Sequence, residues 1–262
     1  MQPMNERNAQ LTDFATDWLQ REPALALCHR FAAKPAHWLA SVVLIEELLQ
    51  AMFALSNQQL AQAKLAWWAD EADLAISGAP RHPLTQALIA ARADLYALPK
   101  LVQAAQEWIM LTTAADANDA RKQFAELATA ASGLVGEGDC TAIWTELALK
   151  RQIQSYMKPD RYGPSVLSRA VLAEFQLRAS QISDVAAVAA ALAAKLSAIC
   201  ATLRDALPTQ AQNMQSATRA YALLHAREAA TWAKSALAAQ AGFLSRPPGV
   251  IGLLQAWWIA RI

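Results

Sequence analysis

The chain has 262 residues, 55% of them hydrophobic and 17% charged, so it can bury a large core and is too apolar for a disordered protein. Its 23 Lys and Arg against 22 Asp and Glu give a net charge of +1, which argues against a nucleic-acid partner. Ala makes up about a quarter of the residues, whereas Gly and Pro number 8 and 11. We therefore predict an all-α fold, with one helical domain over residues 1–262.

The cysteines and the N-terminal residues indicate the cellular compartment of the protein. Three widely spaced cysteines form neither a disulfide framework nor a Cys-x-x-Cys motif, and residues 1–7 lack the layout of a secretory signal. These features predict a cytoplasmic protein. We expect no transmembrane segment, because segment 185–203 is mostly Ala with Lys195 in its middle and segment 248–262 is shorter than the ~20 residues of a span. A peripheral membrane contact through Trp257-Trp258 remains open.

Short breakers separate the predicted helices. Prolines bound the first ones, because the residue before a proline avoids helical backbone angles. Asn57 is a predicted N-cap, and His82-Pro83 opens a helix after the break at Ser77–Pro80. A turn between helices is predicted at Gly133–Gly138. Helices are expected at 8–22, 36–55, 57–76, 97–113, 116–132, 140–156, 183–206, 211–241 and 249–260. Two others are expected, a short one that passes through Cys28 and stops at Lys34, and one that begins at His82.

Carboxylates are the main candidates for chemistry, because the histidines lack metal-ligand spacing and no Gly-x-Ser-x-Gly elbow exists. Asp70 to Asp73 follows Trp67-Trp68 and is typical of the exposed face of an amphipathic helix. Glu46 and Glu47 lie in an apolar helix, so at least one should point inward. An inward carboxylate needs a partner such as Lys64, Lys150 or Arg151. A structural ion pair and a ligand site both remain open.

Two segments resemble the squalene/phytoene synthase family. Residues 61–71 read Ala-Gln-Ala-Lys-Leu-Ala-Trp-Trp-Ala-Asp-Glu, similar to the family's Lys/Arg-Leu-x-Trp-Trp helix. Residues 78–88, Gly-Ala-Pro-Arg-His-Pro-Leu-Thr-Gln-Ala-Leu, are similar to the Gly-x-Pro-x-His-Pro loop and the helix after it. The family joins two prenyl diphosphates inside an all-α bundle. The resemblance therefore implies a helical bundle of the isoprenoid synthase type across most of the chain.

The family's catalysis depends on two aspartate-rich motifs that hold magnesium and, through it, diphosphate. The position of the first motif falls on Leu49 and Phe53 in this sequence. The second, counted back from Gly163 and Leu167, falls on Ser155 and Pro159. These residues are not magnesium ligands, so the departures argue against the family's reaction.

One branch of the family also lacks the first motif. It comprises the proteins similar to the mitochondrial complex I assembly factor, which carry Phe-Asn-x-Glu-Leu there. Residues 44–48, Leu-Ile-Glu-Glu-Leu, resemble that pattern at Glu47-Leu48, while its Phe-Asn part is absent.

Three functions remain open. The first is a non-catalytic member of the fold that binds a lipid or protein partner and needs no cofactor. The second is an active prenyltransferase that condenses farnesyl or geranylgeranyl diphosphate with magnesium held by atypical carboxylates, and the third is an unrelated helical scaffold protein. We assign no catalytic residue and no metal ligand. The candidate cavity or ligand-binding residues are Glu46, Glu47, Lys64, Trp68, Asp70, Arg151, Asp160 and Arg161.

Overall fold

The structure, a computed structural model, describes residues 14–55, 57–110, 117–156, 185–210 and 214–233. Every regular element within these ranges is a helix, which confirms the predicted all-α fold. A short helix covers residues 14–21. The following elements are α2 (Pro23–Cys28), the 3-10 helix η1 (His29–Phe31), α3 (Pro35–Phe53), α4 (Gln58–Ile76), α5 (Pro83–Ala90), α6 (Ala97–Met110), α7 (Ala117–Val135), α8 (Thr141–Tyr156), α10 (Val185–Gln210) and α11 (Ser216–Ala233).

Local signals set the starts of helices in the first half of the chain. Pro35 and Pro83 are the first residues of α3 and α5, where the N–H that proline lacks has no helical partner. The Asn57 side chain caps α4, because its oxygen accepts a backbone N–H of the first turn at 2.9 Å. The ring Nδ1 of His82 accepts a first-turn N–H of α5 at 3.2 Å. The predicted starts at Asn57 and His82 are confirmed.

The end of α7 lies three residues beyond the predicted one. α7 continues to Val135 because Leu134 and Val135 are buried in the core. The carbonyl oxygen of Leu134 accepts hydrogen bonds from His37 Nε2 and Ser41 Oγ of α3, both at 3.0 Å, so this helix end is satisfied. Gly136 then turns the chain with φ +74°, a conformation that favours glycine. The predicted glycine-rich turn is present but begins later.

The helices of the second half also differ from their predicted bounds. α10 continues to Gln210, past the predicted end at 206 and through Pro208. A proline in the last turn removes one helical hydrogen bond, while the buried Leu203 and Leu207 hold this part of α10 in the core. α11 begins at Ser216, later than the predicted 211. The predicted helix at 249–260 lies outside the described residues.

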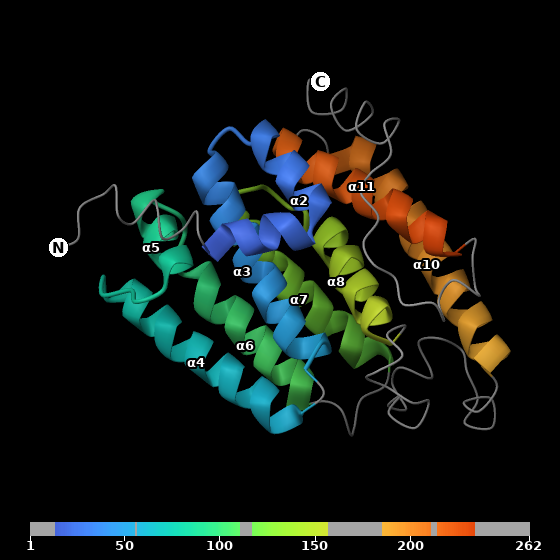
Figure 1. Ribbon diagram of the computed structural model, residues 1–262, viewed down its shortest axis with the longest axis horizontal. Helices are drawn as coiled ribbons and strands as arrows, with labels where there is room; N and C mark the ends of the chain where they lie inside the picture. Colours follow the sequence, from blue (N-terminus) through green and yellow to red (C-terminus); the bar gives the residue numbers. More distant parts are fainter. Residues whose placement is uncertain (1–13, 56, 111–116, 157–184, 211–213, 234–262) are drawn as a thin grey trace.

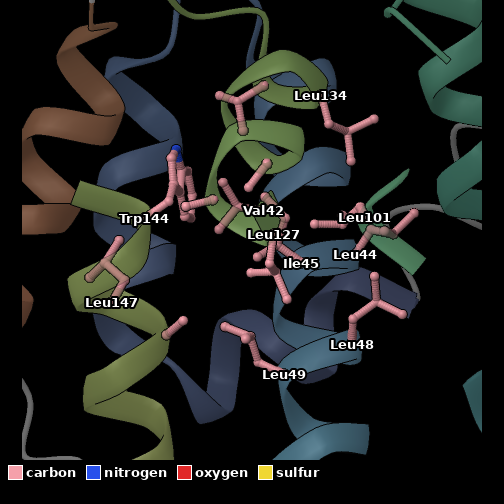
Figure 2. Packing of buried hydrophobic residues seen from close by; sticks show 14 of the residues in the cluster. Val42, Leu44, Ile45, Leu48, Leu49, Leu101, Leu127, Leu134, Trp144 and Leu147 are labelled. Carbon is pink, nitrogen blue, oxygen red and sulfur yellow. The ribbon is translucent and has the colours of Figure 1, made fainter. Parts of the chain in front are cut away.

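α3 runs through the middle of the bundle, with α4, α5 and α6 on one side and α8, α10 and α11 on the other (Figure 1). Figure 2 shows side chains from α3, α6, α7 and α8 meeting between these helices. Val42, Ile45, Leu48, Leu101 and Leu127 are at most 2% exposed there. The space enclosed by these helices is therefore filled by hydrocarbon side chains.

Within the described residues, α3 alone is long and apolar enough to cross a membrane. However, 83% of its most apolar stretch is buried inside the protein. A central core helix has the same length and composition, and the neighbours of α3 in Figure 1 give it that position.

Candidate functional site

Charged side chains gather where α3, α8 and α11 meet, around Glu46 of α3. Glu46 is only 5% exposed. Its Oε2 lies 2.9 Å from Nε of Arg151, and its Oε1 accepts the Tyr221 hydroxyl at 2.7 Å. Arg151 Nη2 also lies 2.9 Å from Oε1 of Glu22, just before α2. We call the polar core cluster the set of Glu22, Glu46, Lys150, Arg151, Tyr221, His225 and Glu228.

Arg151 is held between two carboxylates in this cluster. Burial alone would lower the pKa of its guanidinium, but Glu22 and Glu46 raise that pKa well above its ordinary value. Burial and the nearby Glu46 raise the pKa of Tyr221, so its hydroxyl keeps the proton that it donates to Glu46. The mostly buried charges of Arg151, Glu22 and Glu46 are thus paired with one another, and Glu46 also accepts a hydrogen bond from Tyr221, which offsets their removal from water.

Lys150 joins the second half of the cluster, on α11. Its Nζ donates to Glu228 Oε2 and to His225 Nδ1, each at 2.5 Å. Burial and the Lys150 charge lower the pKa of His225 to about 4, so its ring is neutral at pH 7 and accepts through Nδ1. Burial would raise the pKa of Glu228, but Lys150 and His225 lower it overall. The rings of Tyr221 and His225, 4.2 Å apart, connect the two halves.

Glu47 points away from this cluster. Its Oε2 lies 2.6 Å from Nζ of Lys64 on α4, and its Oε1 accepts the indole N–H of Trp18 at 2.8 Å. The Lys64 side chain is 29% exposed, so this ion pair lies at the edge of the core. Successive helical residues point about 100° apart, which accounts for the different surroundings of Glu46 and Glu47.

The residues that carry the family resemblance form a hydrogen-bonded loop between α4 and α5. Glu71 is fully buried, and its Oε1 accepts the backbone N–H groups of Arg81 at 2.9 Å and His82 at 2.8 Å, and the Thr85 hydroxyl at 2.5 Å. Burial would raise the pKa of Glu71, but these hydrogen bonds lower it overall. The predicted exposed acidic face is wrong for Glu71, because the loop N–H groups need a buried acceptor.

The remaining candidate residues do not join the polar core cluster. Trp68 is buried, with its ring 4.9 Å from that of His82, and Asp70 is exposed on α4. Asp160 and Arg161 lie outside the described residues. In the part of the chain that the structure describes, no three His, Cys, Asp or Glu side chains are grouped so that they could hold a metal ion.

Leu49 and Phe53 occupy the positions where the resemblance places the first aspartate-rich motif. They are 3% and 5% exposed, and Figure 2 shows Leu49 among the core side chains. The Phe53 ring lies 6.0 Å from Trp108 and 6.1 Å from Phe124. These positions are therefore part of the packed core. The second motif falls on Ser155 and Pro159. The Ser155 side chain and all of Pro159 lie outside the described part of the chain.

Glu137 is a further carboxyl group in a buried setting, on the turn between α7 and α8. Its Oε1 accepts the backbone N–H of Gln215 at 3.2 Å, while its buried Oε2 lacks a hydrogen bond of good geometry within the described structure. Burial raises the pKa of Glu137 to about 7, although the hydrogen bonds of Thr218 and Gln215 lower it. The turn is thus tied to the start of α11 by a carboxyl group that titrates near neutrality.

Sequence reasoning missed Glu22, Tyr221, His225 and Glu228 as members of the site. The signal for three of them is the spacing Tyr221, His225 and Glu228 on α11, which places polar groups one turn apart on one helical face. No sequence pattern marks Glu22, because its contact with Arg151 depends on the packing of α2 against α11 in the folded protein.

No protein-family model, no curated protein and no solved structure matches this chain.

Proposed function

We propose that this protein is a non-catalytic member of the squalene/phytoene synthase fold that acts by binding a lipid or protein partner. The observation that carries this proposal is the burial of Leu49 and Phe53, at the positions of the first magnesium-binding motif. Magnesium binds to carboxylate oxygens and water and in turn holds the diphosphate, and leucine and phenylalanine cannot replace those carboxylates.

The use of the charged candidates supports the same proposal. Glu46 and Arg151 pair with each other, and Glu47 pairs with Lys64. A carboxylate that binds magnesium would have to give up its ion pair, and Glu46 would take one of two carboxylates away from the mostly buried Arg151. Breaking a buried pair costs about 3–5 kcal/mol, which opposes the recruitment of Glu46 as a metal ligand.

The filled interior is the third support. An isoprenoid synthase needs an apolar cavity for its prenyl chains, whereas Val42, Ile45 and Leu127 meet between the helices (Figure 2). The space between these described helices is accordingly taken up by side chains, which favours a partner that binds at the surface of the bundle.

The test is an assay of product formation and diphosphate release. Purified protein is incubated with farnesyl or geranylgeranyl diphosphate and magnesium, beside an active squalene synthase as positive control. We expect no turnover above the no-protein background. Turnover that disappears in Asp70→Ala or Glu47→Ala would overturn the proposal and identify replacement metal ligands, and circular dichroism checks that each variant is folded.

A further inference from the structure

A groove of about 550 Å³ runs along the outer seam between α6 and α7. Its floor consists of small residues, among them Ala97, Ala104, Ala130 and Gly133. A Cβ atom added at Gly133 would lie 3.4 Å from Cβ of Ala97, so the two helices approach closely here. Small side chains in the seam of two close helices leave room for a third helix to pack against both.

The walls of the groove are polar and charged. Lys100, Gln103 and Glu107 of α6 face Glu126 and Thr129 of α7 across the groove. Four of these, Lys100, Gln103, Glu126 and Thr129, are exposed. Gln103 Nε2 donates to Glu107 Oε1 at 2.8 Å. Lys100, Gln103 and Glu107 are three or four residues apart, so they line one side of the groove over about 10 Å of helix.

The charges favour a basic occupant. Asp94, Glu107 and Glu126 contribute three carboxylates to the groove, against the single ammonium group of Lys100. Within the described structure none of these four side chains forms an ion pair, so their charges are available to a partner. At one end, the exposed side chain of Tyr96 (73% exposed) offers an aromatic contact of the kind that concentrates binding energy in interfaces.

We propose that this groove binds an amphipathic helix of a partner protein, with small or apolar side chains on the face that enters the groove and an Arg or Lys that reaches Glu107 and Glu126. From Ala97 to Glu107 the groove matches about 15 Å of helix, or nearly three turns. This inference rests on the proposed function, because it names the surface and the kind of partner of a protein that acts by binding.

The test uses two synthetic helical peptides of 14 residues as probes. Both carry Ala and Leu on the inward face, and they differ only in their flanking residues, which are Arg in one and Glu in the other. Fluorescence anisotropy of each labelled peptide is measured against the full chain. We expect saturable binding of the Arg peptide and at least tenfold weaker binding of the Glu peptide.

Two groove variants and one matched control localise the binding. Glu107→Lys/Glu126→Lys reverses the wall charges, and Thr129→Trp fills the groove from an exposed position. Asp73→Lys/Asp205→Lys makes the same change of net charge at exposed residues away from the groove. The dissociation constant of the Arg peptide should rise at least tenfold in both groove variants and stay within twofold in the control, with all variants folded by circular dichroism.

Several results would overturn the inference: no saturable binding of the Arg peptide, equal binding of the two peptides, or an equal loss in the control. The two proposals fail separately. Prenyl diphosphate turnover would refute the non-catalytic function and leave the peptide result standing, whereas absent peptide binding would refute the groove alone.

Discussion

Replacing Glu46 with leucine tests whether the polar core cluster is structural. Leucine is similar in size to glutamate but removes both the ion pair with Arg151 and the acceptor of the Tyr221 hydroxyl. Breaking a buried pair costs about 3–5 kcal/mol, and a hydrogen bond to a charged group accounts for about 1.5–3 kcal/mol of that loss. Because Arg151 keeps Glu22 as a second partner, we expect the lower end, about 3 kcal/mol.

The matched control is Glu47→Leu, the same substitution one residue along the same helix. Its partner Lys64 is partly exposed and can turn to solvent, while Trp18 loses the acceptor of its indole N–H, so the expected cost is about 1–2 kcal/mol. Urea unfolding at pH 7 gives the free energy of unfolding of both variants and of Arg151→Met. The double variant Glu46→Leu/Arg151→Met should lose about 2 kcal/mol less than the sum of the single variants, because the two buried charges leave together.

Three outcomes would refute this reasoning. The first is a smaller cost for Glu46→Leu than for Glu47→Leu. The second is that the effects of Glu46→Leu and Arg151→Met add without coupling, and the third is that Glu46→Leu stabilises the protein. Stabilisation is the result expected of a carboxylate held for a ligand, since functional sites are kept at the expense of stability.

Three other substitutions test the core, the loop and the turn. Phe53→Asp places a carboxylate where the resemblance puts the first motif. We expect it to lower the free energy of unfolding in urea by more than about 4 kcal/mol, because the charge enters a packed aromatic cluster; a tolerated Asp would instead indicate an open cavity. Glu71→Ala should speed hydrogen exchange of the amides of Arg81 and His82, and unchanged exchange would contradict the role of Glu71. The folded-state pKa of Glu137 is about 7, so the unfolded chain ionises this group at a lower pH than the folded protein does. The free energy of unfolding therefore falls as the pH rises from 4.5 to 7, by at most about 3 kcal/mol. Glu137→Gln should therefore stabilise by about 2 kcal/mol at pH 8 and have little effect at pH 4.5, and an equal effect at both pH values would count against the assignment.

Helix starts were predictable because their causes are local. Asn57 caps α4 with its own side chain, and Pro35 and Pro83 suit the first position of a helix, where the missing N–H leaves no helical hydrogen bond unmade. The end of α7 was not predictable in the same way. It depends on His37 and Ser41, nearly 100 residues earlier, whose side chains reach the Leu134 carbonyl only in the folded bundle.

The same distinction applies to the candidate site. The apolar surroundings of Glu46 in the sequence predict an inward carboxylate that needs a cation, and the structure has Arg151 as that partner. The sequence cannot tell which of several basic residues will be the partner, because that choice depends on how α3 and α8 pack. The acidic neighbours of Glu71 predict an exposed face, whereas its loop partners, ten and more residues later, bury it.

The central claim is that the space between the described helices is filled and that Glu46 and Glu47 already have cationic partners. Its most direct test is the melting temperature of the protein with 100 μM geranylgeranyl diphosphate and excess magnesium. A ligand at 100 times its dissociation constant stabilises a protein by about 2.7 kcal/mol, a shift of several degrees that is easily measured. We expect the melting temperature to stay unchanged with the diphosphate, with or without magnesium. A magnesium-dependent rise of several degrees that is lost in Glu47→Ala would contradict the claim.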